Sequence, residues 1–196
     1  MPRSLREKLI LDVAGRLFAR GGYERASMDE IAQLADVSKP MLYAYFGSKE
    51  GLYVAYIERA GDELLARLVR ADRPRERHTV RLRALIGQFL LFVEEQGDSW
   101  TVLFRETTAS RPLADQVSEL RERIVSEVRR MLERRGSSST GLELPASEGV
   151  AHAIVGAGES LANWWLKHPE VPLEQVTDWY VDLAQAAITA AGRHAG

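Results

Sequence analysis

The chain contains no cysteine among its 196 residues. Without a thiol it cannot build a disulfide framework, a thiolate metal site or a cysteine nucleophile. It also lacks an apolar run near the roughly 20 residues that a membrane helix needs, and its first residues carry no apolar signal segment. We therefore expect a soluble, cytoplasmic protein that does not contact a membrane.

The sequence also lacks the motifs of the common enzyme classes. Its four histidines are scattered, and none stands at a metal-ligand spacing from another. There is no nucleophile elbow, no phosphate-binding glycine loop and no dinucleotide fingerprint. Gly156 and Gly158 fall within an expected helix, where they indicate close packing. We expect no enzyme activity, no catalytic residue, no metal and no cofactor.

Strand periodicity is absent as well, whereas apolar residues recur at helical spacing along most of the chain. The sequence therefore predicts an all-α fold of about nine helices. We expect them over residues 4–20, as two short helices within 27–46, and then over 52–70, 80–95, 100–108, 112–132, 145–167 and 172–191.

Residues 27–50 carry the most informative pattern in the chain. Ser27 can cap one short helix, and Glu30 can complete a capping box with it. Asp36 stands where the chain must turn, since aspartate tolerates left-handed backbone. Ser38 can then cap a second short helix. Two short helices joined by a tight turn are typical of a helix-turn-helix.

The second short helix has one core face and one outward face. Leu42 and Phe46 lie four residues apart and share the face that we assign to the core. The outward face offers phosphate donors, groups for base edges and apolar contacts for thymine methyls. We expect Tyr43 and Lys49 to contact phosphate, and Lys39 and Met41 to approach base edges. The predicted DNA-binding residues are Ser27, Ser38, Lys39, Pro40, Met41, Tyr43, Tyr45 and Lys49.

The distribution of charge agrees with a DNA-binding head. The net charge of the whole chain is −2. Residues 1–49 carry eight Lys or Arg against six Asp or Glu, so the excess of acidic residues lies in the remainder. Two runs rich in arginine, residues 73–83 and 129–135, are expected to be solvated helix faces.

The same residues carry a family resemblance. The segments Ile31–Ala32, Ala35–Ser38, Leu42–Phe46 and Ser48–Leu52 closely resemble the signature of the tetracycline-repressor (TetR) family. The resemblance covers about residues 5–58, and beyond them only length and helical organisation match. Asp36 differs from the glycine common in the family at the turn, but aspartate can adopt the conformation needed there. Pro40 and Tyr45 also differ from the family and face DNA, so the resemblance does not imply an operator sequence.

The resemblance implies a transcriptional regulator with two domains. Residues 1–47 would form a three-helix helix-turn-helix DNA-binding domain, and residues 48–196 a ligand-binding and dimerisation domain. The expected function is repression from a palindromic double-stranded DNA operator, bound as a homodimer and released by a small molecule. An activator, or an orphan regulator without a ligand, remains an alternative. So does a helical-bundle enzyme or carrier whose head is purely structural.

The last two expected helices are rich in small and apolar residues, which let helices approach closely. They are either two core helices or a face for a partner subunit. The resemblance favours the second interpretation, because the family dimerises through a four-helix bundle built from these helices. The candidate interface residues are Ala157, Leu161, Trp165, Trp179 and Leu183.

Aromatic residues of the middle helices suggest a site for a largely apolar small molecule. Ordinary aromatic core packing is the better explanation for any one of them, but as a set they resemble the family's inducer pocket in location. The only obvious partner for an anionic group on such a ligand is Arg105, which could equally pair with Glu106 or face solvent. The candidate residues are Phe89, Phe92, Trp100, Phe104, Arg105 and Trp164.

Overall fold

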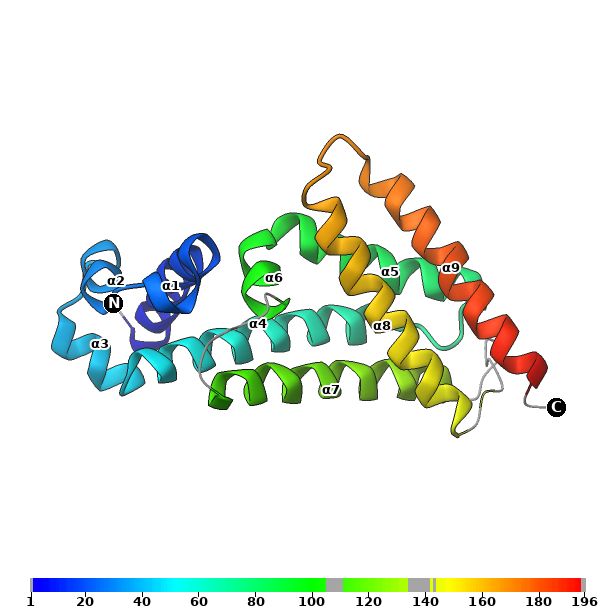
Figure 1. Cartoon of the computed structure of the whole chain (residues 1–196), viewed down its shortest axis with the longest axis horizontal. Helices are drawn as coiled ribbons and strands as arrows, with labels where there is room; N and C mark the ends of the chain where they lie inside the picture. Colours follow the sequence, from blue (N-terminus) through cyan, green and yellow to red (C-terminus); the bar gives the residue numbers. More distant parts are fainter. Residues whose placement is uncertain (1, 105–110, 134–141, 143, 195–196) are drawn as a thin grey trace. The chain divides into compact units, whose positions relative to one another are not determined.

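The structure, a computed structural model, describes residues 2–104, 111–133, 142 and 144–194. These residues form nine helices and no strand, which confirms the predicted all-α fold (Figure 1). The helices are α1 (Arg3–Arg25), α2 (Met28–Leu34), α3 (Lys39–Phe46), α4 (Lys49–Ala71), α5 (His78–Glu95), α6 (Gly97–Phe104), α7 (Arg111–Glu133), α8 (Ala146–Trp165) and α9 (Leu173–His194).

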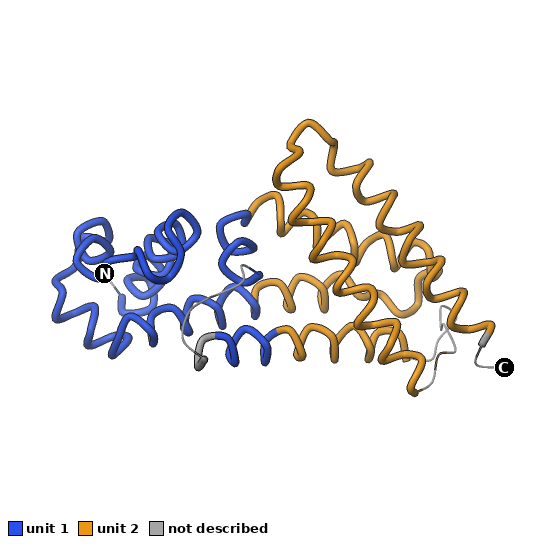
Figure 2. Tube along the Cα trace, viewed as in Figure 1, with its two compact units in different colours: residues 1–62, 96–120 blue, residues 63–95, 121–196 orange. Residues whose placement is uncertain are grey.

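The chain divides into two compact units, which Figure 2 colours separately. Unit 1 contains residues 1–62 and 96–120, and unit 2 contains residues 63–95 and 121–196. The division falls within α4 and within α7. These units group residues by packing, whereas the predicted boundary between residues 47 and 48 concerns function. That boundary therefore stays a prediction.

Unit 1 is built around aromatic side chains between α1, α4 and α6. Phe18 of α1 meets the ring of Tyr53 edge to face, with 4.9 Å between the ring centroids. The Tyr56 hydroxyl shares a hydrogen bond of 2.9 Å with the hydroxyl of Ser99. Tyr56 also needs Gly15, because a Cβ added there would lie 2.2 Å from the tyrosine ring. The small residue allows α1 and α4 to approach closely.

The end of α1 differs from the prediction. The sequence predicts a first helix over residues 4–20, but the helical run continues to Arg25. Gly22 alone is non-helical, with φ of 73°. A glycine adopts positive φ without steric cost, so one residue kinks the run and helical turns resume after it. The kink places Tyr23 beside Tyr53, at 5.2 Å between ring centroids.

Unit 2 is held together by α5 and α8, which both pack against α9. Tyr180 of α9 lies at the centre of this packing. Its hydroxyl donates to the backbone carbonyl of Ile154 over 2.7 Å, and its ring meets Phe89 at 5.9 Å. Gly158 provides the space, since a Cβ there would lie 2.4 Å from the Tyr180 hydroxyl oxygen. This confirms that Gly158 serves close packing. The same expectation is wrong for Gly156, where an added Cβ would meet nothing within 4 Å.

One expectation about the arginine-rich run 73–83 is wrong. Arg81 is buried, whereas a solvated face was expected. Its Nε lies 2.5 Å from Oδ1 of Asp72, and its Nη2 donates to the carbonyl of Met131 over 2.8 Å. Arg81 belongs to the buried face of α5, and Asp72, the residue that follows α4, compensates its charge there. Arg73, Arg77 and Arg83 are exposed, as expected.

Candidate nucleic-acid interface

Three serine caps set the boundaries of α2, α3 and α4. The Ser27 hydroxyl accepts from the N–H of Asp29 over 3.2 Å, and that of Ser38 accepts from the N–H of Met41 over 3.3 Å. Ser48 accepts from the N–H of Gly51 over 3.0 Å. These bonds satisfy backbone donors that have no partner within the helix. The cap at Ser27 is therefore confirmed.

The predicted capping box is only half present. The Ser27 hydroxyl accepts from the N–H of Asp29, the second helical residue, and not from that of Glu30. Among the described residues, the Glu30 side chain makes no hydrogen bond back to Ser27. The turn between the two helices is as predicted, since Asp36 has φ of 52°. Aspartate holds this left-handed conformation where the chain reverses between α2 and α3.

The recognition helix α3 is anchored by one fully buried side chain. Leu42 is 0 % exposed and lies in the core of the head with Ile31 and Ala32 of α2. Phe46, predicted to share that core, is only half-buried. Anchoring at Leu42 leaves the other side of α3 outward. Lys39, Pro40 and Tyr43 are exposed there, and Met41 and Tyr45 are half-buried.

Lys39 is held on the surface by Asp29 of α2. Its Nζ lies 2.8 Å from Oδ1 of the aspartate, and the two side chains are 49 % and 70 % exposed. The hydrogen bond and the negative charge of Asp29 raise the pKa of Lys39, so the ammonium stays charged. An exposed pair of this kind contributes little to folding, because water solvates both groups almost as well. Lys39 can therefore exchange its carboxylate for a group on DNA.

Lys49 has a second role besides the one predicted. Its Nζ donates to the backbone carbonyl of Glu24 over 3.0 Å and lies 4.6 Å from the centroid of the Tyr23 ring. It thus joins the start of α4 to the end of α1. An ammonium has three donors, so donors remain for a phosphate.

Sequence reasoning missed one basic residue of this surface. The guanidinium of Arg3 lies over the ring of Tyr45, 5.2 Å from its centroid. Nothing in the local pattern of either segment indicates this contact, because the two residues are 42 positions apart and only the fold brings them together. Arg3 adds positive charge beside the outward face of α3.

The residues predicted to line a ligand site divide between the two units. Phe89, Phe92 and Trp164 belong to unit 2, Trp100 and Phe104 belong to unit 1, and Arg105 lies outside the described residues. Phe92 and Trp100 are buried, and Trp100 stacks on Phe104 at 4.0 Å. Trp164 is 39 % exposed and stacks on His168 at 4.4 Å. The ligand site stays a prediction.

The candidate dimer residues fall into two groups. Trp179 and Leu183 of α9 are 44 % and 51 % exposed, although both side chains are large and apolar. Ala157 and Leu161 of α8 are half-buried. Trp165 is buried instead, and its indole N–H donates to the carbonyl of Val171 over 2.8 Å. The structure thus gives Trp165 a role within its own chain.

No group of three or more His, Asp or Glu side chains in the described part of the chain could hold a metal ion. None of the described helices combines the length and the apolar character needed to cross a membrane.

Comparison with known proteins gives consistent matches over the whole chain. Residues 10–56 match the family model described as bacterial regulatory proteins, tetR family. Residues 78–187 match the model described as tetracyclin repressor-like, C-terminal domain. The HTH-type transcriptional activator FasR of Mycolicibacterium smegmatis is 32% identical over 169 residues, which are 86% of this chain and 75% of that protein.

Solved structures share the fold. A TetR-like transcriptional regulator from Rhodococcus sp. RHA1 is 34% identical, with a TM-score of 0.77 over 94% of this chain and 96% of its own. The regulator FadR from Bacillus subtilis, solved in complex with stearoyl-CoA, has a TM-score of 0.76 over 90% of this chain and 96% of its own. At 16% identity the second likeness concerns the fold alone.

Proposed function

We propose that this chain, which belongs to the TetR family of bacterial transcriptional regulators, binds a palindromic operator as a homodimer. The binding of a small molecule then releases the protein from the operator. The observation that carries the proposal is the outward face of α3. The buried Leu42 fixes the helix in the head, while Lys39 and Tyr43, one helical turn apart, are left exposed. A helix that served only packing would gain no stability from exposing these two side chains.

The outward residues divide the work of binding. Lys39 and Met41 approach base edges in the major groove, and Tyr43 contacts phosphate. Lys49 contacts phosphate from the first turn of α4 while it keeps its bond to the Glu24 carbonyl. Ser27, Ser38, Pro40 and Tyr45 complete the proposed contact surface.

Footprinting on the intergenic DNA that flanks the gene tests this proposal. Two protected half-sites, related by a two-fold axis and centred about one helical turn or a multiple of it apart, are the expected result. Unrelated DNA of equal length at the same salt concentration is the control, because phosphate contacts alone bind any sequence. Equal binding to both DNAs would contradict operator recognition.

The homodimer is proposed to form through α8 and α9. Exposed Trp179 and Leu183, with Trp164 6.1 Å from Trp179 between ring centroids, offer apolar surface that a second copy would cover. Because these side chains are already exposed in the single chain, a polar substitution does not bury a charge within it. Leu183→Asp should therefore give a folded chain that sediments as a monomer. The operator binding of this monomer should be weak. A wild-type chain that sediments as a monomer at micromolar concentration would contradict the proposal.

The effector is proposed to be largely apolar. Phe89, Phe92, Trp100, Phe104 and Trp164 support this class, and the FadR structure holds a ligand with a long acyl chain. A long-chain acyl thioester is the first probe to use. Tryptophan fluorescence should respond to it at the same concentrations that weaken operator binding. If acyl thioesters of a range of chain lengths change neither the tryptophan fluorescence nor the DNA affinity, the result would favour an orphan regulator.

Activation is the second candidate function. It is supported by the relative FasR, whose name identifies it as an activator. A reporter fused to the operator-bearing promoter separates the two signs of regulation. Deletion of the regulator gene raises expression if the protein represses and lowers it if the protein activates.

A further inference from the structure

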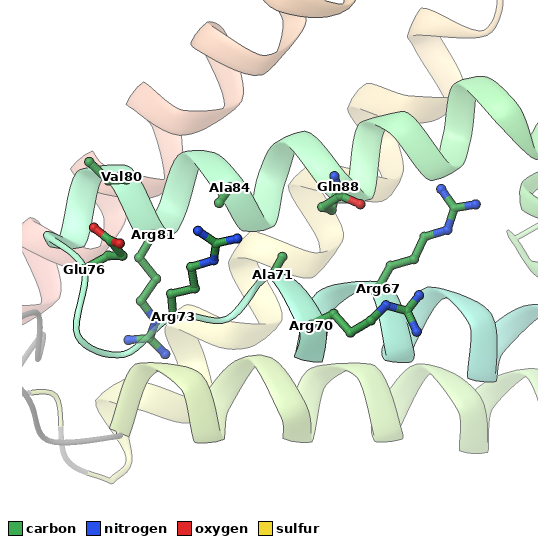
Figure 3. Close-up of a pocket in the computed structure, with 9 residues that line it drawn as sticks. All are labelled: Arg67, Arg70, Ala71, Arg73, Glu76, Val80, Arg81, Ala84 and Gln88. Atoms are coloured by element: carbon green, nitrogen blue, oxygen red, sulfur yellow. The ribbon is translucent and has the colours of Figure 1, made fainter.

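Unit 2 contains a groove between the end of α4 and the beginning of α5 that the regulatory mechanism above does not use. Its volume is about 350 Å³. This size is within the range of about 300–1,000 Å³ found for small-molecule sites, and it exceeds what a single phosphate ion fills. Figure 3 shows the lining residues, which are Arg67, Arg70, Ala71, Arg73, Glu76, Val80, Arg81, Ala84 and Gln88.

Two of the four arginines in the groove are already neutralised. Arg81 is paired with the buried Asp72. Arg67 lies between Glu63 and Glu95, at 2.9 Å and 2.8 Å from their carboxylate oxygens. These two side chains are fixed by their partners, so they form a rigid wall and provide no free charge.

The other two arginines have no such partner. Arg70 and Arg73 are exposed, and among the described residues neither forms an ion pair. Glu76 is the only acidic residue in the lining. Because Arg70 and Arg73 face this single carboxylate, the lining carries an excess of positive charge.

The rest of the groove suits an organic group. Ala71, Val80 and Ala84 give it an apolar surface, and Gln88 adds an amide that can both donate and accept. In Figure 3 the side chain of Arg73 extends from the loop toward α5, and that of Arg70 extends along α4. The charged side chains and the apolar wall thus lie in one cavity.

We propose that this groove is a binding site for a phosphorylated small molecule, whose phosphate is bound by Arg73 and by Arg70 once the exposed Arg70 side chain turns from α4 toward the groove. A phosphate monoester has three terminal oxygens, so one group can accept from two guanidinium forks. A carboxylate has two oxygens, and one arginine satisfies both. The organic part of the ligand lies against Ala71, Val80 and Ala84. The site is independent of operator binding and of the aromatic residues proposed for the effector.

Calorimetric titration of the full chain with pyrophosphate, in the absence of DNA, tests the proposal. Saturable binding with one site per chain is expected, and it weakens as salt is added because the groove is open to solvent. The variant R70Q/R73Q should bind at least about tenfold more weakly, since it loses charge-assisted hydrogen bonds. Both side chains are exposed, so the variant should keep the circular dichroism and melting temperature of the wild type.

Two further variants separate a ligand site from a general effect of charge. Glu76→Gln removes the opposing carboxylate and should tighten pyrophosphate binding. Arg20→Gln removes one exposed positive charge from α1, outside the groove, and should change the affinity by less than about twofold. A merely structural role of the arginines predicts no effect of Glu76→Gln on binding.

Three results would overturn the proposal. They are the absence of saturable pyrophosphate binding, equal affinity of R70Q/R73Q and wild type, and equal affinity for pyrophosphate and citrate. Citrate carries a similar charge on carboxylates, so equal affinity would mean that the groove does not distinguish phosphate. None of these results bears on operator binding, which is measured separately by footprinting.

Discussion

One ion pair from each compact unit shows how exposure changes what a pair can do. In unit 1 the side chains of Lys39 and Asp29 are 49 % and 70 % exposed. In unit 2 those of Arg81 and Asp72 are 5 % and 1 % exposed. Water or a DNA group can replace either partner of the first pair at little cost, whereas opening the second leaves a buried charge without compensation. Exposure of the pair, and not its presence, separates a cation that is free to act from one that holds the fold.

A second pair of sites is more alike. Each unit buries a tyrosine against a helix glycine, Tyr56 on Gly15 in unit 1 and Tyr180 on Gly158 in unit 2. The Tyr56 hydroxyl is bonded to the side chain of Ser99, while the Tyr180 hydroxyl donates to a backbone carbonyl of α8. The packing device is therefore common to both units, whereas the two ion pairs compared above differ in exposure.

The largest expected effect comes from breaking the buried pair. Asp72→Ala leaves the Arg81 guanidinium buried without its carboxylate, and we expect the free energy of unfolding to fall by about 3–5 kcal/mol. Asp29→Ala is the matched control, because it breaks the exposed pair with Lys39, and its denaturation midpoint should equal that of the wild type. Equal losses in the two variants, measured by denaturant unfolding, would remove the distinction between the two pairs.

Alanine at the packing glycines should give the next largest effect. Gly158→Ala and Gly15→Ala each force a tyrosine away, with an expected loss of about 1–3 kcal/mol. At Gly158 the shortest approach is to the tyrosine hydroxyl at 2.4 Å, whereas at Gly15 two ring carbons and the hydroxyl oxygen all lie within 2.5 Å. Adding Tyr180→Phe should therefore recover part of the loss, and adding Tyr56→Phe should recover less.

The control for this pair is Gly149→Ala. A Cβ at Gly149 of α8 meets nothing within 4 Å. The substitution should therefore leave stability unchanged or raise it by up to about 1 kcal/mol, because alanine favours helix. If all three alanine variants melt together, close packing does not explain the glycines.

The features that sequence predicted well are local. The caps at Ser27 and Ser38 each depend on a hydroxyl and a backbone N–H two or three residues away. The left-handed turn at Asp36 depends on one residue. Helical periodicity gave the order of all nine helices in the described chain, because a repeating apolar face is itself a local pattern. Local chemistry determines these features, so a single sequence is enough to find them.

The features that sequence missed depend on distant segments. Burial of Arg81 requires Asp72 nine residues before it and the carbonyl of Met131 fifty residues after it. No pattern within the arginine-rich run indicates that one member is buried and the others are exposed. The contact of Arg3 with Tyr45 is of the same kind. These arrangements follow from tertiary packing, which decides where each face of a helix points.

Substitutions in the head sharpen the comparison through DNA binding. Lys39→Ala should keep the melting temperature and change base preference by roughly tenfold at the contacted position, because the group reads a base edge. Lys49→Ala should weaken binding to all sequences alike and reduce the salt slope by about one, as the loss of a phosphate contact does. Quantitative binding to operator and mutated operators, at several salt concentrations, measures both. Wild-type binding by both folded variants would show that α3 is placed otherwise.

The smallest expected effect concerns a single carboxyl group in unit 2. Burial raises the pKa of Glu159, and Arg121, which is bonded to it, opposes the shift. A raised pKa means that the folded chain binds this proton more tightly than the unfolded chain, so this group's contribution to stability falls as the pH rises through the interval between the ordinary and the raised pKa.

Glu159→Gln keeps the shape without the charge. We expect it to be more stable than the wild type at neutral pH by less than about 1 kcal/mol, with the difference shrinking as the pH falls through that interval. Unfolding measured from about pH 4 to about pH 7 tests this expectation. A Glu159→Gln chain that is less stable at neutral pH would mean that the bond to Arg121 outweighs burial, and unit 2 would then use this charge as it uses Asp72.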